Sequence, residues 1–463
     1  MIYKKLNSIQ FSAAVITAVL ISLIYFSLNF NYLSRFIDEK GDCLTYDYYV
    51  RLGIPQYLFN PHHIGFDWAG EQLYKIMHEN GYTGTTMAAL QLRNLIFSSL
   101  CIGIMFFLFY KISKRYLLSL GIVLMYTFCA AHWIYSQIND TPIIHSNMTF
   151  ILFLAALYFP QARHKKAYAG LLGFWHALTI FFHQSDAIMA LPVVFILMFY
   201  TLFPNEENKH SHFTFANIRY VAVYVIVFCI IVAVAYYYVG IVLIGLDFNK
   251  ENAKAFNNIK DSSYFFNWLI LYAKIDYWGK GFSSENTQAL FGQMVNGIST
   301  YFYQPQTFQG KEIGFDFGNL FGAASILPNF IGILFIFVLG GSILFFIPLL
   351  RRYNHAVPAT VLYMIIYSAL TCWWEADYRE FWVAPMFSFW FLTLIFFNFI
   401  MEKACVAKPF IHTTCYSFIF ILAGLLFYFN FTGFILPYSG NKYQTYTITQ
   451  DSYNCTPIPT YYK

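Results

Sequence analysis

Residues 8–30 read SIQFSAAVITAVLISLIYFSLNF, and no residue in this stretch is charged. An apolar run of about 18 or more residues is long enough to cross a bilayer as an α-helix. Runs of this kind recur along the chain. We predict eleven spans, at 8–30, 92–110, 117–135, 143–159, 167–182, 187–203, 220–245, 325–350, 356–374, 382–400 and 410–430. The fifth and sixth spans are short, and a re-entrant hairpin is the alternative for that pair.

The composition is that of a polytopic membrane protein. Of the 463 residues, 58% are hydrophobic and only 11% are charged, whereas soluble domains carry about 25% charged residues. The runs are apolar throughout and do not alternate with period two, which argues against a transmembrane β-barrel. Helices satisfy their own backbone groups in lipid, so we expect an all-α fold. The eight cysteines are scattered without a CxxC or Cys/His spacing, and they assign no metal ligand.

The charged residues predict an orientation. If the N-terminus is cytoplasmic, the inner segments hold 14 of the 28 Lys and Arg residues but only 3 of the 23 Asp and Glu residues. Lys and Arg on short loops set the orientation of a membrane protein. We therefore expect the N-terminus inside and the C-terminus outside. Since acids do not govern insertion, their excess on the outer side predicts a functional outer face.

We expect one transmembrane domain, 1–430, followed by an outer tail, 431–463. Two long outer loops, 31–91 and 246–324, are expected to carry short amphipathic helices at the membrane surface. The short outer connections are 136–142, 183–186 and 375–381.

The first outer loop holds a dense group of titratable residues, in GDCLTYDYYVRLGIPQYLFNPHHIGFDWAGEQLY at 41–74. Asp42 and Asp47 follow the first span closely. A carboxylate held just above the bilayer can act as a general base toward an acceptor hydroxyl. A solvated loop acid is the alternative for each. If this part is helical, Asp42 and Tyr46 share a face and Asp47 points elsewhere.

His62 and His63 follow the turn signal Asn60-Pro61 in the same loop. Neutral imidazoles bind divalent metal ions, and protonated ones bind phosphate. Adjacent histidines seldom face one site together, so we expect one of them to be functional. An interfacial histidine bonded to the backbone is the alternative. A divalent cation is therefore left open as a cofactor, without assigned ligands.

Other polar residues are predicted at the same outer level. His183 and Gln184 lie where the fifth span meets the surface, and ionisable residues near membrane depth are often functional. Asp186, Asp140 and His145 belong to this level too, with helix capping as the alternative for the two acids.

The segment WWEADYREFWVAP, at 373–385, lies at the outer mouth of the ninth and tenth spans. Its tryptophans fit an interfacial aromatic belt. The planar guanidinium of Arg379 suits phosphate. It could equally pair with Glu375, four residues earlier, as a structural ion pair.

These segments resemble the GT-C superfamily of polytopic membrane glycosyltransferases, in particular its protein-mannosyltransferase-like bacterial members. The resemblance rests on GDCLTYDYY followed by LFNPHHIGFDWAGEQLY, on FFHQSDAIMALP, on WWEADYREFWVAP and on the predicted topology. It implies a polyprenyl-phosphate-linked sugar as donor, transfer with inversion, and a lipid, glycan or protein acceptor. It implies a bacterial cytoplasmic membrane with the active site on its outer face, and no nucleic-acid partner.

The resemblance also implies residue roles. Asp42 would be the general base, with Asp47 as the second candidate. The donor phosphate would be met by basic residues near the membrane. The substrate-binding candidates are His62, His63, Arg93, His183, Gln184, Glu375 and Arg379.

Two other functions compete with this one. A transporter or flippase of a lipid-linked or polar solute predicts ionisable residues at mid-membrane and symmetry between halves, whereas the sequence has outer acids and no visible repeat. A membrane acyltransferase would use a histidine–aspartate pair as base, such as His183 with Asp186.

Overall fold

The computed structural model describes residues 7–33, 42–200, 217–249, 264–270, 289–303, 326–404 and 409–436. Most of the second long outer loop and nearly all of the predicted tail lie outside these residues. In chain order the helices are α1 (Ser8–Phe30), α2 (Asp42–Leu52), α3 (Pro55–Leu58), α4 (Phe66–Glu79), α5 (Thr86–Ser113), α6 (Tyr116–Thr127), α7 (Ala130–Tyr135), α8 (Pro142–Tyr158), η1 (Phe159–Gln161), α9 (Lys165–Phe182), η2 (Gln184–Met189), α10 (Ala190–Phe199), α11 (Ile218–Tyr237), η4 (Tyr238–Leu243), α12 (Phe265–Leu269), α13 (Leu290–Phe302), α14 (Ile326–Phe335), η7 (Ile336–Gly340), α15 (Gly341–Leu344), α16 (Phe346–Tyr353), α17 (Ala356–Trp374), η8 (Arg379–Trp382), α18 (Val383–Ala404), α19 (Pro409–Asn430) and η9 (Phe431–Ile435).

The expected fold class is confirmed: the protein is an all-helical, multi-pass integral membrane protein. Eight helices among the described residues are long and apolar enough to cross a membrane, and the same residues form no strand beyond one isolated bridge. The other three predicted spans are helical but shorter or less apolar. The span predicted at 117–135 breaks after Thr127 into α6 and α7. The spans predicted at 167–182 and 187–203 correspond to α9 and to η2 with α10.

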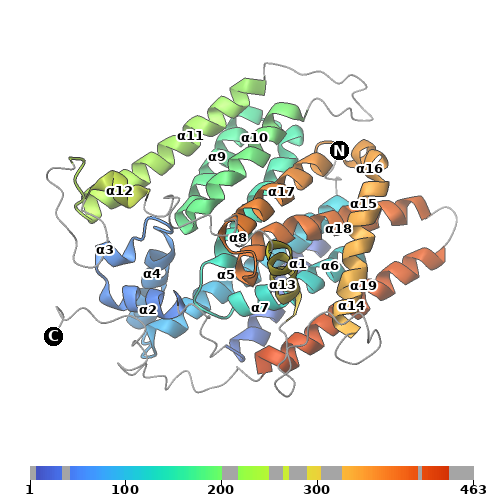
Figure 1. Ribbon diagram of the computed structural model, residues 1–463, viewed down its shortest axis with the longest axis horizontal. Helices are drawn as coiled ribbons and strands as arrows, with labels where there is room; N and C mark the ends of the chain where they lie inside the picture. Colours follow the sequence, from blue (N-terminus) through green and yellow to red (C-terminus); the bar gives the residue numbers. More distant parts are fainter. Residues whose placement is uncertain are drawn as a thin grey trace.

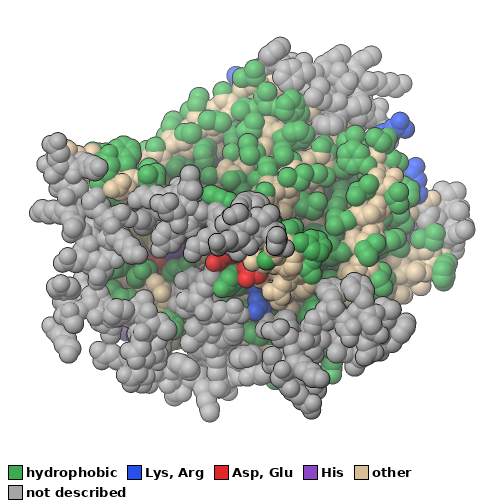
Figure 2. Space-filling model, in the orientation of Figure 1, with side chains coloured by type: hydrophobic (Ala, Val, Ile, Leu, Met, Phe, Trp, Pro, Cys, Tyr) green, Lys and Arg blue, Asp and Glu red, His purple; other side chains and the backbone are tan. Residues whose placement is uncertain are grey.

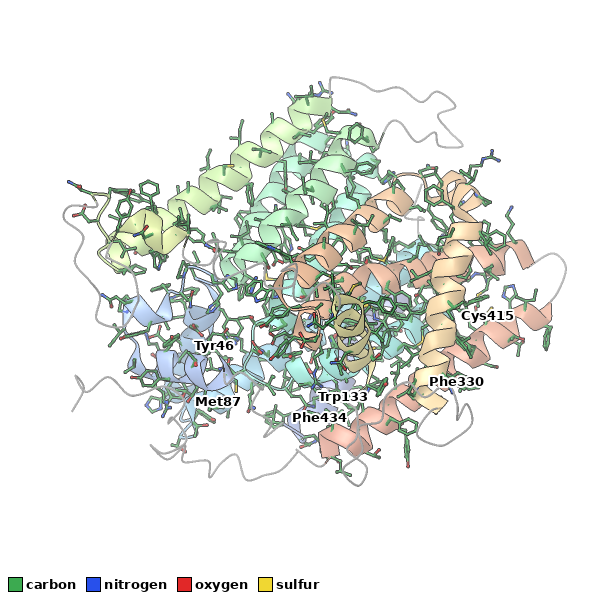
Figure 3. All side chains as sticks on the ribbon, in the orientation of Figure 1. Tyr46, Met87, Trp133, Phe330, Cys415 and Phe434 are labelled. Atoms are coloured by element: carbon green, nitrogen blue, oxygen red, sulfur yellow. The ribbon has the colours of Figure 1, made fainter. Side chains whose placement is uncertain are left out.

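Helix α18 lies at the centre of the bundle, between α17, α8 and α6, and crosses the middle of the view in Figure 1. Its buried Trp390 donates to the hydroxyl of Tyr301 in α13 at 3.0 Å. Aromatic side chains fill the spaces between the helices, as around Trp133 (Figure 3), whose ring lies 5.6 Å from that of Phe427 in α19. Many of the aromatic side chains therefore pack the helices against one another.

The surface agrees with a lipid environment. Figure 2 shows a face that is hydrophobic over much of its described area. Large apolar side chains are exposed on α1 and α11, including Ile9, Ile16 and Ile230. Removing such side chains from water is favourable, so their exposure is explained if these helix faces contact lipid.

The loop that follows the first span folds into the short helices α2, α3 and α4, which lie together at the lower left of Figure 1. Two backbone hydrogen bonds tie this loop to the α9–η2 junction. The amide of Gly65 donates to the carbonyl of Phe181 at 2.6 Å, and the amide of Gln184 donates to the carbonyl of His62 at 2.8 Å. Segments more than 100 residues apart in sequence are thereby joined through the main chain.

Candidate functional site

A cavity of about 200 Å³ lies where the loop helices meet one end of the bundle. Its walls come from α2 and the turn after α3, from the start of α8, from the α9–η2 junction, and from the corner between α17 and α18. The residues predicted at the outer level thus come together at one end. The polar and aromatic lining includes Tyr46, Tyr49, Asn60, His62, His63, Asp140, Thr141, His145, His183, Ser185, Tyr367, Trp374 and Glu380.

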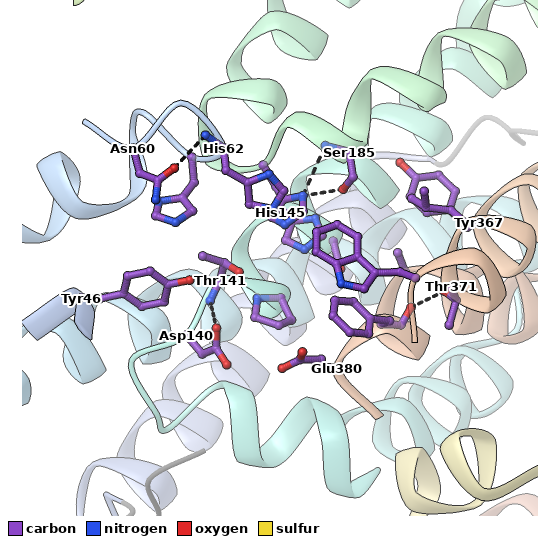
Figure 4. Close-up of a pocket in the computed structure, with 18 of the residues that line it drawn as sticks. Tyr46, Asn60, His62, Asp140, Thr141, His145, Ser185, Tyr367, Thr371 and Glu380 are labelled. Carbon is purple, nitrogen blue, oxygen red and sulfur yellow. Dashed lines mark hydrogen bonds between the residues drawn. The ribbon is translucent and has the colours of Figure 1, made fainter. Parts of the chain in front are cut away.

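The cavity has two chemically different sides. Figure 4 shows the imidazoles of His62 and His145 on one side and the carboxylates of Asp140 and Glu380 across from them. The ring of His183 joins the two imidazoles, with its centroid 3.9 Å from that of His62 and 4.4 Å from that of His145. The arrangement offers hydrogen-bond donors on one side and proton acceptors on the other.

Burial keeps much of the imidazole side neutral. Burial first, and then the neighbouring His63 and His145, lower the pKa of His62 well below its usual value. Burial lowers the pKa of His63 to about 3. Burial and the neighbouring imidazoles lower the pKa of His183 well below its usual value. Neutral imidazoles can each donate one hydrogen bond and accept another, which suits a phosphate or a sugar.

The turn after α3 is held by its own polar residues. Asn60 accepts from the amide of His62 through its side chain and from the amide of His63 through its carbonyl, both at 3.0 Å. The hydroxyl of Tyr236 in α11 donates to the carbonyl of Pro61 at 2.9 Å. Both histidines line the cavity, whereas we expected only one of them to be functional.

A carboxylate supports the imidazole side from behind. Asp186 is fully buried, and its Oδ1 lies 3.2 Å from Nδ1 of His145. The hydroxyl of Tyr367 donates to the same oxygen at 3.3 Å. Asp186 therefore orients a neighbouring ring and does not simply cap a helix.

The carboxylate side is anchored to the framework. Asp140 accepts from the amide of Thr141 at 2.6 Å through Oδ1. Asn94 in α5 donates to the backbone carbonyl of Asp140 at 2.7 Å, and Tyr135 donates to Glu380 at 3.4 Å. Both acids were visible in the sequence, but only the fold brings them into one cavity.

Asp47 does not line the cavity. It accepts from the hydroxyl of Thr86 and pairs with Arg51 at 3.1 Å. Burial raises its pKa, and Arg51 and Thr86 act in the opposite direction. Tyr46 of the same helix does line the cavity, which is the division of faces expected for a helix. Asp42 begins α2, and its side chain lies outside the described part of the chain.

Arg93 is buried, and its hydrogen bonds connect neighbouring segments of the fold. Its guanidinium donates to the carbonyl of Phe66 at 2.6 Å and to the side chain of Asn139 at 3.0 Å. It also lies 3.6 Å above the ring of Phe66. Arg93 thus joins α5 to α4 and to the segment that carries Asp140, and it is not among the cavity-lining residues.

The remaining predicted residues lie beside the cavity. The side chain of Gln184 donates to the carbonyl of Leu269 at 3.3 Å. Glu375 ends α17 and Arg379 begins η8, and neither lines the cavity, although Glu380 does. Within the described residues no group of three or more His, Cys, Asp or Glu residues is arranged to hold a metal ion.

No protein-family model matches the chain, and no curated protein matches it. A solved structure of the Archaeoglobus fulgidus oligosaccharyltransferase, in complex with Zn and sulfate, is similar over 89% of this chain and 52% of that one, with 16% identity and a TM-score of 0.50. The archaeal oligosaccharyltransferase AglB from Archaeoglobus fulgidus, in complex with an inhibitory peptide and a dolichol-phosphate, is similar over 93% and 56%, with 15% identity and a TM-score of 0.49.

The chain spans a little over half the length of these proteins. At such low identity, the similarity at a TM-score of 0.50 concerns the fold alone. It agrees with the all-helical membrane fold expected from the sequence. The finer resemblance to protein-mannosyltransferase-like bacterial members stays a prediction.

Proposed function

We propose that this protein is a membrane glycosyltransferase that moves a sugar from a polyprenyl-phosphate-linked donor to an acceptor on the outer face of the membrane. The observation that carries the proposal is the two-sided cavity at one end of the bundle (Figure 4). A donor phosphate on the imidazole side would present its sugar toward the carboxylate side. An inverting displacement needs the leaving group and the base on opposite faces of the sugar.

The membrane location favours a lipid-linked donor. Such a donor travels within the bilayer and carries its phosphate at the depth of the lipid headgroups. The cavity lies at the ends of spanning helices, with His183 at the end of α9 and Trp374 at the end of α17. The oligosaccharyltransferase of similar fold makes glycosyl transfer the first reaction class to test.

Asp42 remains our proposed general base. It begins α2 four residues before the cavity-lining Tyr46, and residues four apart lie on one face of a helix. Asp47 is the weaker candidate because its carboxylate is engaged by Thr86 and Arg51. The acceptor proton would pass to the base as the acceptor oxygen attacks the sugar.

The test is release of free polyprenyl phosphate from a panel of lipid-linked sugars by the purified protein. We expect the wild type to release it and Asp42→Asn to lose this activity while keeping its fold. The control is Asp247→Asn, which changes an acid that caps the backbone at Asn249 and does not line the cavity. Normal release by Asp42→Asn would overturn the base assignment. An inactive wild type with every donor would refute the proposed function.

A further inference from the structure

His145 has a carboxylate at hydrogen-bond distance. Its Nδ1 lies 3.2 Å from Oδ1 of Asp186. The ring of His63 also has a carboxylate neighbour, Asp67, but at 3.8 Å, which is too long for a hydrogen bond. His145 stacks on His183 with the ring planes 22° apart, so one face of its ring is fixed as well.

The backbone of Asp186 is held independently of His145. Its amide donates to the carbonyl of His183 at 3.1 Å. Its own carbonyl lies 2.8 Å from Nε2 of His176 in α9, and Nδ1 of His176 meets the hydroxyl of Tyr224 in α11. The carboxylate is therefore aimed at His145 by the fold, before any ligand arrives.

The carboxylate of Asp186 needs stabilising partners because it is buried. The side chain of Asp186 is fully buried, and its Oδ2 has no hydrogen-bond partner within the described residues. A buried carboxylate needs hydrogen bonds or a positive charge nearby. Tyr367 supplies one hydrogen bond at 3.3 Å. Nδ1 of His145 lies at hydrogen-bond distance from the same oxygen, at 3.2 Å.

We propose that Asp186 positions His145 by accepting a hydrogen bond from its Nδ1–H, and that His145 uses Nε2 to protonate the phosphate that leaves the lipid-linked donor. This inference rests on the proposed function and assigns its leaving-group side. Nε2 is the ring nitrogen left for the cavity that His145 lines, because the bond to Nδ1 fixes the tautomer. The same division of roles holds wherever a carboxylate orients a catalytic imidazole.

The step balances without another reactant. The bond between the anomeric carbon and the phosphate oxygen breaks, and its electron pair leaves with the phosphate. The acceptor oxygen bonds to the carbon and gives its proton to the carboxylate base. His145 gives its Nε2 proton to the departing phosphate oxygen and becomes neutral. Water then returns a proton to His145 and takes one from the base.

Other titratable groups line the same cavity or contact His145. They are Tyr46 and Tyr49 from α2, His62 and His63 from the turn after α3, His183 and Asp186 from the α9–η2 junction, Tyr367 from α17, Glu380 from η8, and Asp140 just before α8. Burial lowers the pKa of the three other imidazoles. They therefore stay neutral near pH 7, whereas the Asp186 carboxylate beside His145 offers a counter-charge.

The experiment measures the protons taken up when polyprenyl phosphate, the product, binds to the full chain in detergent. Calorimetry in two buffers of different ionisation enthalpy gives this number between pH 5.5 and 8.5. We expect uptake by the wild type, since a phosphate dianion favours the protonated ring. Asp186→Asn keeps the shape and loses the charge, and its uptake should move to lower pH.

Tyr367→Phe is an independent test, because its expected shift in the pH of proton uptake is opposite to that of Asp186→Asn. It removes a donor to Asp186, so the carboxylate charge is less satisfied and uptake should move to higher pH. His355→Gln is the matched control, because His355 is a buried histidine outside the cavity, with Nε2 3.4 Å from the carbonyl of Leu157. Its profile should equal that of the wild type.

The outcomes separate the two proposals. Phosphate binding without proton uptake, or with the same profile in Asp186→Asn and Tyr367→Phe, would overturn the role of His145 and leave the proposed function standing. A wild type that does not bind polyprenyl phosphate at any pH would overturn both. Inorganic phosphate is the second arm: weaker binding supports a lipid-linked ligand, and equal binding refutes that source.

Discussion

The buried His63 leads to a quantitative prediction about stability and pH. Its side chain is 2% exposed, and burial lowers its pKa from 6.5 to about 3. In the unfolded chain the imidazole regains a pKa of about 6.5. Below that pH the unfolded state binds the extra proton, so the stability of the folded state falls as the pH falls. Between pH 7.5 and 5.5 one such imidazole lowers the free energy of unfolding by about 1.4 kcal/mol.

The assay is the free energy of unfolding measured by reversible transfer into SDS at the two pH values. Glutamine does not titrate, so His63→Gln should lose about 1.4 kcal/mol less than the wild type over this range. The pH dependence of the wild type alone does not isolate His63, because Asp67 changes the free energy of unfolding in the opposite direction. The difference between the wild type and His63→Gln is therefore the quantity to measure. Burial raises the pKa of Asp67 well above the usual value, and this raised pKa favours the folded state as the pH falls.

His78→Gln is the control for the chemical change itself. His78 is exposed near the end of α4, so this variant should follow the wild type. Equal losses of free energy in the wild type and in His63→Gln would refute the reasoning. Such a result would mean that the imidazole reaches water or carries a proton in the folded protein.

Three further predictions concern the framework, with unfolding free energies as the readout. Gly297→Ala should cost about 1–3 kcal/mol, because its methyl group would meet the backbone of Ala376 and the indole of Trp382. Gly292→Ala on the same helix has open space and should be nearly neutral. Equal effects of the two substitutions would contradict this packing. Arg93→Met should cost about 3 kcal/mol or more because several buried acceptors lose their donor, and a neutral result would place Arg93 in solvent. Arg352→Gln should cost less than about 1 kcal/mol, since its pair with Glu402 is partly exposed, and a larger loss would indicate a more deeply desolvated pair.

Hydrophobic runs predicted the helices well, because lipid leaves few other ways to satisfy the backbone. The limit of this reasoning is seen at 117–135. Phe128 and Cys129 separate α6 from α7, yet neither residue is a helix breaker by itself. The break is accompanied by tertiary contacts, such as the ring of Phe128 lying 5.0 Å from that of Phe427 in α19. Hydropathy alone does not register such contacts.

The candidate site was predictable as a set of segments and less so as a set of contacts. Four outer segments were expected at one level, and the cavity draws residues from that level. The pairing of His145 with Asp186 joins residues 41 positions apart, and no local spacing reveals it. Arg93 illustrates a second limit of the sequence. A cation near the membrane surface suggested phosphate binding, but its donors are used by neighbouring helices.

The two main-chain bonds between the first loop and the α9–η2 junction bear on how this site can evolve. They use the amides of Gly65 and Gln184 and the carbonyls of Phe181 and His62. Every residue except proline supplies both groups, so most replacements of Phe181, Gln184 or His62 would leave the bonds in place, whereas a side chain at Gly65 would press against Phe181. The histidine side of the cavity can therefore exchange side chains, and with them its ligand preference, while its scaffold is inherited unchanged.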